Sequence, residues 1–148
     1  MTKRKLFIHC KNHIKKKQNI LEQRKNELQW ALTNETKSSA GDKHEIGRAM
    51  IQLEREKLGN QLAEMEQNFQ KLRPLKNHVN TGIVSVGSVV HIDNANYYIA
   101  LATESCEIES KTYYCISPIS PIGNLLLGKK IKEHINFNNT ASTIIEIL

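Results

Sequence analysis

The stretch "TNETKSSAGDKHE", Thr33 to Glu45, separates two long runs of helix-forming residues. From about Lys11 to Arg73 the chain has no proline and few β-branched residues, whereas Glu, Gln, Lys, Leu and Asn dominate. This composition favours helix, and the polar stretch Thr33–Gly41 favours a turn. We therefore predict two helices joined by a short turn. The second would run from about Asp42 to Lys71, a rod of about 45 Å at about 1.5 Å per residue.

Apolar residues recur every seven positions in both runs, which places them on one helix face. The first run has Ile14, Leu21 and Leu28, but Lys17 and Arg24 occupy its second seam. The second run has two seams, formed by Ile51, Leu58, Met65 and Leu72 and by Leu62 and Phe69. The pattern predicts an antiparallel helical hairpin over residues 1–74.

Two acids, Asp42 and Glu45, stand at the start of the second predicted helix. Asp is a preferred N-cap, and Glu three residues later completes a capping box. On spacing alone, this local role is the favoured interpretation. The same spacing also puts two carboxylates on one side of the helix, where their oxygens would suit Mg²⁺. Two carboxylates are too few for a tight site, so a partner would have to supply the other ligands.

The pattern changes after Arg73-Pro74, where the proline ends the helix. Residues 75–82 are a predicted linker. Strands are expected over 84–92, 97–101, 112–116, 131–137 and 142–147, with turns at 93–96 and at Asn138-Asn139. A short helix is expected from Pro121 to Leu127, ended by Gly128. Residues 83–148 should thus form a small, mostly antiparallel sheet with one helix packed on it, so the fold class is α+β.

Charge and composition narrow the possible functions. The net charge is +6, with ten Lys/Arg and three Glu in residues 1–40 but four Lys/Arg and six Asp/Glu in residues 81–148. The basic part would attract RNA or an acidic protein surface. Only eight residues are aromatic, which disfavours an aromatic nucleic-acid platform. No Ser, His and Asp grouping, phosphate-cradling glycine loop or nucleophilic cysteine motif indicates an enzyme.

The start of the chain has an apolar run of only Leu6-Phe7-Ile8, too short for a secretion signal or a membrane span. We therefore expect a cytoplasmic location and no membrane partner. The three cysteines, Cys10, Cys106 and Cys115, should then be reduced. His9, Cys10 and His13 could suggest a metal site, but no second ligand pair has zinc spacing.

Several motifs together resemble the GreA/GreB family of bacterial transcript cleavage factors. The segment "ISPISPIGNLLLGKK", Ile116 to Lys130, resembles the family's Ile-Ser, Ser-Pro-Ile/Leu and Leu-Gly-Lys signature. Val86–Val90 resembles its opening strand, and Glu104 lies where the family often has an acid. Gly41-Asp42-x-x-Glu45 resembles the tip of the family's coiled coil. The resemblance covers nearly the whole chain.

The resemblance implies an accessory factor and not a stand-alone enzyme. The sheet domain would be FKBP-like and would dock at the secondary channel of RNA polymerase, while the coiled coil enters the channel. Asp42 and Glu45 would help to hold a Mg²⁺ ion shared with the polymerase active site, so that backtracked nascent RNA is cleaved. No tightly bound cofactor is implied, and we expect a monomer.

Two alternatives remain open. The family usually continues the tip with Asn-Ala-Glu-Tyr, whereas this chain has Ile46-Gly47-Arg48-Ala49. A secondary-channel regulator or inhibitor of RNA polymerase that does not stimulate cleavage is therefore the first alternative. The second is an FKBP-like isomerase or chaperone with a helical arm, which the scarcity of aromatic residues in the sheet domain disfavours.

Two further groups are candidate contacts with RNA or polymerase. Basic residues of the first helix could follow RNA or an acidic channel wall, although a solvated helix face explains them equally well; they are Lys15, Lys16, Lys17, Arg24 and Lys25. The turn Ser120, Pro121, Ile122 and Gly123 begins the short helix, and the resemblance adds a contact with polymerase there.

Overall fold

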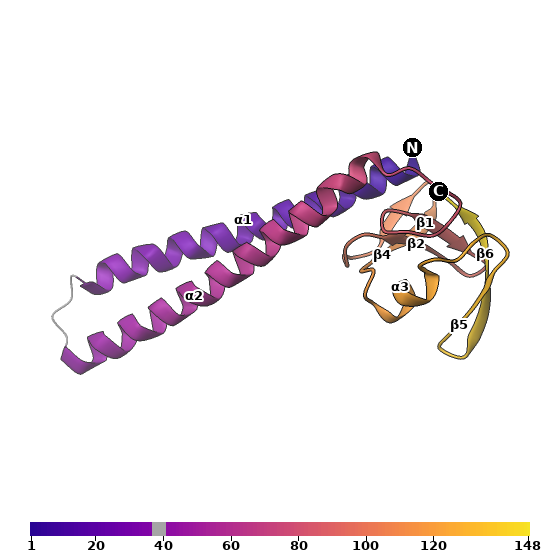
Figure 1. Cartoon of the computed structure of the whole chain (residues 1–148). Coiled ribbons are helices and arrows are strands. Elements are labelled where there is room, and N and C mark those ends of the chain that lie inside the picture. Colours follow the sequence, from indigo (N-terminus) through magenta and orange to yellow (C-terminus); the bar gives the residue numbers. More distant parts are fainter. Residues whose placement is uncertain (37–40) are drawn as a thin grey trace. The chain divides into compact units, whose positions relative to one another are not determined.

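The computed structural model describes the backbone of residues 1–36 and 41–148 and the side chains of residues 1–34 and 46–148. Two long helices precede a six-stranded, mainly antiparallel sheet with one short helix, so the predicted α+β class is confirmed (Figure 1). The chain forms two compact units. One is Ile14–Phe69, and the other combines Met1–His13 with Gln70–Leu148. The predicted hairpin spans residues 1–74, whereas Met1–His13 and the residues from Gln70 onward belong to the unit that contains the sheet.

The helical unit consists of parts of α1 (Thr2–Thr36) and α2 (Gly41–Leu72), which run antiparallel (Figure 1). The predicted seam residues of this unit are buried or half-buried: Ile14, Leu21, Leu28, Ile51, Leu58, Leu62, Met65 and Phe69. Lys17 and Arg24, which interrupt the first seam, are exposed. An ion pair joins the two helices at Arg24 Nη2 and Glu54 Oε1, 3.4 Å apart. The seven-residue spacing therefore identified the paired face.

Helix α1 is longer at both ends than the composition predicted. Thr33, placed in the turn by the sequence analysis, lies inside the helix, where its hydroxyl donates a hydrogen bond to the Gln29 carbonyl at 3.0 Å. At the other end the helix begins at Thr2, and both Leu6 and Cys10 are fully buried. Residues four apart share a helix face, so these first turns are amphipathic despite their many lysines. Helix α2 ends at Leu72, before the predicted stop at Pro74, and a 3₁₀ helix (η1, Arg73–Asn77) follows.

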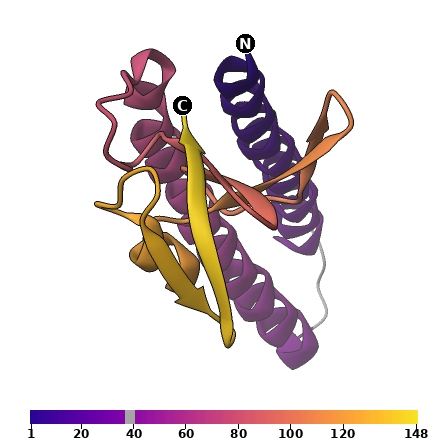
Figure 2. The ribbon, with the colours of Figure 1, turned by 90° about the vertical axis from the view of Figure 1, so that its right-hand side faces the viewer.

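The sheet has the strand order β3-β4-β2-β1-β6-β5. Its strands are β1 (Val89–Ile92), β2 (Ala95–Ile99), β3 (Cys106–Ile108), β4 (Lys111–Ile116), β5 (His134–Phe137) and β6 (Thr140–Ile147). Every pair is antiparallel except β2 with β4, which is parallel. Figure 2 shows the β5–β6 hairpin at one edge of the sheet.

Two features of the sheet differ from the sequence prediction. Strand β3 was missed because its hairpin turn, Glu109-Ser110, lacks the usual Asn or Gly, although both residues have positive φ. By contrast, Asn138-Asn139 has the predicted turn, also with positive φ at both positions. The first strand is shorter than predicted and begins only at Val89, because Gly87 (φ +99°) breaks the extended backbone.

Both faces of the sheet are covered. One carries the apolar cluster beneath helix α3 (Pro121–Leu126), in which Ile122 and Leu126 pack with Val90, Ile92, Ile99 and Ile144. On the other face, Val89, Tyr98 and Cys115 are buried and lie opposite one another in register. Cys10 of α1 hydrogen-bonds to Cys115. The start of α1 therefore covers the sheet face opposite α3.

A hydrogen-bonded chain ties α1 to the segment after η1. Lys3 Nζ donates to His78 Nδ1 at 2.9 Å, which leaves the imidazole proton on Nε2 to be donated to Ser85 Oγ at 2.8 Å. Gly87 lies against this ring, since a Cβ at position 87 would come within 2.8 Å of His78 Cδ2. Burial, followed by the charge of Lys3, lowers the pKa of His78.

The lowered pKa of His78 predicts a loss of stability in mild acid. A histidine whose folded-state pKa lies below its unfolded value contributes full stability above the unfolded pKa, and this is lost as pH falls toward the folded pKa. We expect the free energy of unfolding to fall as pH drops below about 6.5. His78→Gln keeps an acceptor for Lys3 but cannot titrate, so it should lose less stability. Urea denaturation at a series of pH values measures the difference.

The matched control is His134→Gln, since His134 is an exposed histidine of the same unit. This variant measures what the loss of an exposed histidine does to stability at each pH, and the change produced by His78→Gln should exceed it. If the free energy of unfolding falls with pH as steeply in His78→Gln as in the unmodified chain, His78 is not the cause of the loss of stability in acid.

Candidate functional site

A tight turn before α3 carries the segment that the sequence analysis linked to partner binding. Ser120 is the N-cap of α3; its hydroxyl accepts from the Gly123 amide at 3.1 Å and donates to the Ser117 carbonyl at 2.6 Å. The Ser117 hydroxyl accepts from the Ile119 amide at 3.3 Å. Asn124 Nδ2 donates to the Ile119 carbonyl at 3.3 Å. Both ends of the turn are thus fixed by local hydrogen bonds.

The turn presents an apolar tip to solvent. Ile119 is 83% exposed and Pro121 is also exposed, whereas Ile122 and Gly123 are buried. Of the four predicted contact residues, Ile122 and Gly123 therefore shape the turn from inside, and Pro121, with half-buried Ser120, offers surface. Ile119 was not singled out from sequence. The sequence signal for its exposure is its position between two serine-proline pairs. A single apolar residue in such a constrained loop has no apolar neighbour close in sequence on which to pack.

Gly123 is required by close approach. A Cβ at this position would collide with the Ser117 carbonyl oxygen and come within 2.9 Å of Ser120 Oγ. Any side chain would have to displace the same groups that close the turn. Each residue of the Ser-Pro-Ile-Gly sequence thus has a local structural role: the serine caps α3, the proline begins it, the isoleucine is buried in the core, and the glycine allows the close contact with Ser117.

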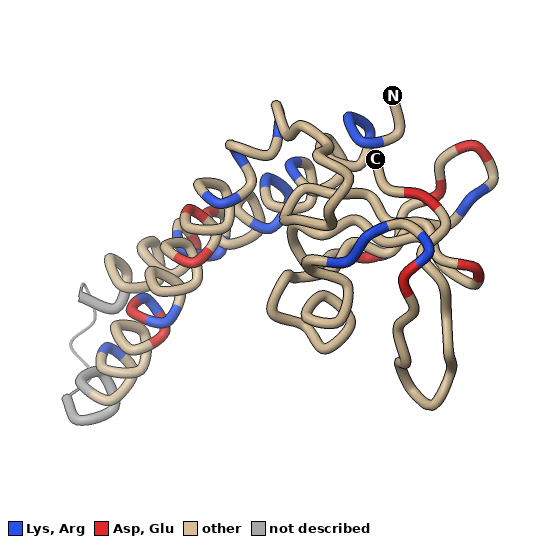
Figure 3. Tube along the Cα trace, turned by 45° about the vertical axis from the view of Figure 1, so that its right-hand side comes forward, with Lys and Arg blue, Asp and Glu red and all other residues tan. Residues whose placement is uncertain are grey.

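The predicted basic residues all lie in the helical unit and all are exposed: Lys15, Lys16, Lys17, Arg24 and Lys25. Lys and Arg recur along both helices, with acidic residues among them (Figure 3). Arg24 is paired with Glu54, in part neutralising its charge. Exposure is compatible both with a polyanion contact and with an ordinary solvated face, so both interpretations remain.

The predicted tip acids belong to the first turns of α2 by position, since that helix begins at Gly41. The side chains of Asp42 and Glu45 lie outside the described part of the structure, as does the backbone of residues 37–40. The donor set itself suits magnesium, because carboxylate oxygens are its preferred protein ligands. Among the described residues, no group of three or more His, Cys, Asp or Glu side chains could hold a metal ion.

A cavity of about 310 Å³ lies between α3 and the sheet. Three aromatic side chains, Tyr97, Tyr114 and Phe137, line it together with Ile122 and Ile135. The rings of Tyr97 and Tyr114 are 5.9 Å apart. The scarcity of aromatic residues in the sheet domain disfavours a proline-binding pocket, yet most of its few aromatic side chains meet at this cavity. Composition could not show that convergence.

A buried thiol pair lies between α1 and the opposite face of the sheet. The hydrogen bond between them raises the pKa of Cys10 and lowers that of Cys115. Cys10 is 0% exposed and Cys115 4%, which denies a substrate access to either sulfur. The Tyr98 hydroxyl, also buried, has no hydrogen-bond partner within the described structure. These groups serve packing and not nucleophilic catalysis.

Histidines beside the thiol pair hold α1 to the loop after β2. His9 Nε2 donates to the Glu104 carbonyl at 3.0 Å, and His13 Nδ1 lies 2.8 Å from Glu104 Oε2. A hydrogen bond from its own backbone, and then the one to His13, lowers the pKa of Glu104. The acid that the sequence analysis noted by resemblance is thus a structural partner of α1.

No family model, curated protein or solved structure matches this chain. Within the described ranges, no helix has both the length and the apolar character needed to cross a bilayer.

The collision at Gly123 predicts that Gly123→Ala destabilises the sheet-containing unit by about 1–3 kcal/mol, the usual range for overpacking. The free energy of unfolding can be measured by urea denaturation followed by tyrosine fluorescence and circular dichroism.

Gly59→Ala is the matched control. Gly59 is exposed inside α2, and a Cβ there would meet nothing within 4 Å. This change should stabilise the helix by about 0.5–1 kcal/mol, because glycine is a poor helix residue. Equal stability of Gly123→Ala and the unmodified chain would show that the turn can relax at no cost.

Proposed function

We propose that this protein is an accessory factor of RNA polymerase of the GreA/GreB type. It would bind through the secondary channel and stimulate cleavage of backtracked RNA by the polymerase. The observation that carries the proposal is the combination of an antiparallel helix pair, with Asp42 and Glu45 at the start of its second helix, and an α+β unit that bears the Ser-Pro-Ile-Gly turn.

The proposed roles divide between the two units. The turn at Ser120 offers a rigid apolar contact, Ile119 with Pro121, of the kind that anchors protein interfaces. Asp42 and Glu45 stand three positions apart in the first turns of α2, a spacing that places two residues on the same side of a helix. Asp42 and Glu45 would hold a Mg²⁺ ion together with groups of the polymerase. Such an ion supplies an activated water and stabilises charge in phosphodiester hydrolysis. The reaction would belong to the polymerase, so this chain is not itself an enzyme.

The first alternative is a channel-binding regulator that does not stimulate cleavage. It is favoured by the sequence after the acids, Ile46-Gly47-Arg48-Ala49, which replaces the Asn, Glu and Tyr common in the family. Arg48, three positions after Glu45 in the sequence, is exposed and positively charged. A cleavage assay on stalled elongation complexes separates the two, since both proteins would bind polymerase and only the first would shorten the transcript.

The second alternative, an FKBP-like isomerase or chaperone, gains support from the cavity lined by Tyr97, Tyr114 and Phe137. Aromatic and aliphatic walls with a few polar groups are typical of small-ligand and peptide sites. A proline isomerisation assay on a short peptide tests it, with Tyr114→Ala as the variant expected to lose activity because Tyr114 is 46% exposed at the cavity.

Removing both tip acids tests the main proposal. The double variant Asp42→Ala, Glu45→Ala should reduce transcript cleavage in stalled complexes to the rate without added factor, because the shared metal loses its extra ligands. Circular dichroism should remain helical, and the variant should still co-purify with polymerase.

The matched control changes two exposed acids of the same helix, Glu56→Ala and Glu64→Ala. It should retain cleavage. Unchanged cleavage by the Asp42/Glu45 variant would exclude a metal role for these acids.

Removing the apolar tip of the α3 turn tests docking. Ile119→Ser should weaken co-purification with polymerase by about tenfold, the range for an interface anchor worth about 1–2 kcal/mol. Ile145→Ser is the control, since Ile145 is an exposed isoleucine of β6 (56%) outside this turn. If both variants bind equally well, the α3 turn is not the contact.

A further inference from the structure

A second surface of the sheet-containing unit has the features of a binding site. A cavity of about 570 Å³ lies between the first turns of α1 and the 3₁₀ helix η1. Phe7, Ile8 and Leu75, together with Met1, form its apolar lining. Ile8 is 44% exposed although it belongs to a helix that buries Leu6 and Cys10 completely. The volume lies in the range of ligand and peptide sites.

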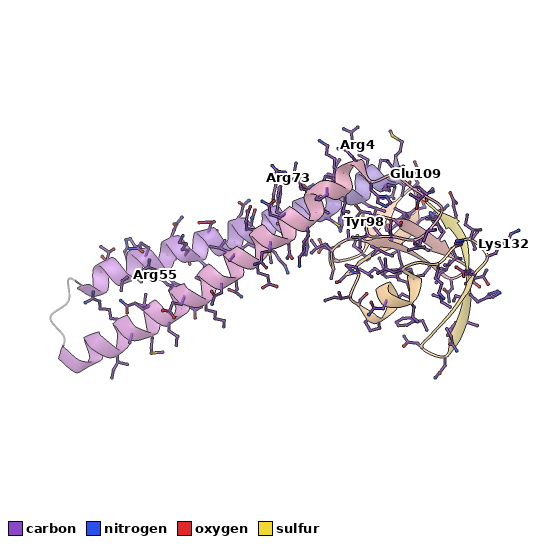
Figure 4. All side chains as sticks on the ribbon, viewed as in Figure 1. Arg4, Arg55, Arg73, Tyr98, Glu109 and Lys132 are labelled. Carbon is purple, nitrogen blue, oxygen red and sulfur yellow. The ribbon has the colours of Figure 1, made fainter. Side chains whose placement is uncertain are left out.

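Four cationic residues surround this apolar lining: Lys3, Arg4, Lys11 and Lys76. None of the described residues that line the cavity is acidic, and neither of the ion pairs found in the described structure involves these four side chains. Arg4 lies near the beginning of α1, with its side chain directed outward (Figure 4). The site therefore carries concentrated positive charge that the described part of the unit does not neutralise.

The position of these charges opposes the preference of the helix. A helix N-terminus is already partly positive, so acids stabilise its first turn and cations destabilise it. The first turn of α1 contains no acid and instead carries Lys3, Arg4 and Lys5. Helix stability does not account for these residues, whereas an anionic partner would gain from both the side chains and the helix end.

Lys3 is held in place rather than free to swing into solvent. Its ammonium group donates to the neutral ring of His78 at 2.9 Å, and burial lowers its pKa. A neutral acceptor satisfies one proton of the ammonium group but does not balance its charge. A carboxylate of a partner next to the Lys3 ammonium group would balance this charge. It would also accept a hydrogen bond from a donor that is already held in place.

We propose that this cationic groove, formed by α1 and η1, binds an acidic amphipathic segment of a partner protein. The segment would place carboxylates over Lys3, Arg4, Lys11 and Lys76 and an apolar side chain on Phe7, Ile8 and Leu75. Protein is favoured over RNA because Phe7 is the one aromatic among the described lining residues, whereas single-stranded nucleic acid is usually held by successive aromatic rings. The groove shares no residue with the tip acids or the Ser120 turn, so this inference goes beyond the proposed function and does not depend on it.

Fluorescence anisotropy with the full chain tests the groove. The probe is a fluorescein-labelled helical peptide with Glu on one face and Leu on the other; one control probe has Gln in place of every Glu, and a second is single-stranded oligouridine RNA. We expect the acidic peptide to bind, to weaken as salt is added, and to bind at least about tenfold tighter than the Gln peptide.

The variant Arg4→Glu, Lys76→Glu should weaken acidic-peptide binding by about tenfold or more, because two attractive contacts become repulsive. Both side chains are exposed, so the fold should survive. The matched control Lys111→Glu, Lys132→Glu makes the same change in net charge at exposed residues that do not line the cavity and should bind within about twofold of the unmodified chain. Ile8→Ser should also weaken binding if the groove holds an apolar side chain of the peptide. Attraction between charges alone would leave the affinity of this variant unchanged.

Three results would overturn the proposal. In the first, the acidic peptide binds the Arg4/Lys76 variant as tightly as the unmodified chain. In the second, the control variant loses as much affinity, which would indicate general attraction to a basic protein. In the third, oligouridine binds tighter than the peptide and is lost in the Arg4/Lys76 variant, which would identify a nucleic-acid site.

Discussion

The burial of Leu6 and Cys10 in the first turns of α1 organises the unit to which they belong. Both side chains are fully covered, and Cys10 reaches Cys115 beside Tyr98. Burying a side chain the size of Leu stabilises by about 1.5–3 kcal/mol. This contact brings His9 and His13 to Glu104 and Lys3 to His78. It also sets the first turns of α1 beside η1, so the cationic groove exists only because this helix face is buried.

The same contact has a polar cost. The Tyr98 hydroxyl is buried without a hydrogen-bond partner in the described structure, and an unsatisfied group of this kind costs about 1–3 kcal/mol. The two thiols next to it are weak donors and acceptors. Hydrogen bonds at the rim offset part of the cost, since the loop after β2 accepts from His9 and pairs with His13. The interface between the start of α1 and the sheet is therefore apolar in its interior, where the cysteines pack, and is stabilised by polar contacts at its edge.

Three surfaces of the chain differ in how they arise. The turn before α3 is built by local rules: Ser120 caps, Pro121 begins the helix and Gly123 clears the Ser117 carbonyl. The aromatic cavity arises from residues of β2, β4 and β5 that are distant in sequence. The cationic groove joins residues more than sixty positions apart, since Lys3 and Lys76 line it together. Only the first could be located from a short motif, and even there the most exposed residue, Ile119, was not singled out.

The sequence by itself determined the elements whose causes are local. Seven-residue spacing gave the helix pair, Pro74 gave the end of α2 to within two residues, and Asn138-Asn139 gave the last hairpin. It also determined the α+β class and the start of α3 at Pro121. Tertiary structure alone decided the β3 strand, the parallel pairing of β2 with β4, and the extension of α1 back to Thr2. The physical reason is that a lysine-rich first turn and a Glu-Ser hairpin turn have no favourable local energy. They form because other parts of the chain supply stabilising contacts: Cys115, far along the chain, contacts α1, and strand β4 pairs with β3.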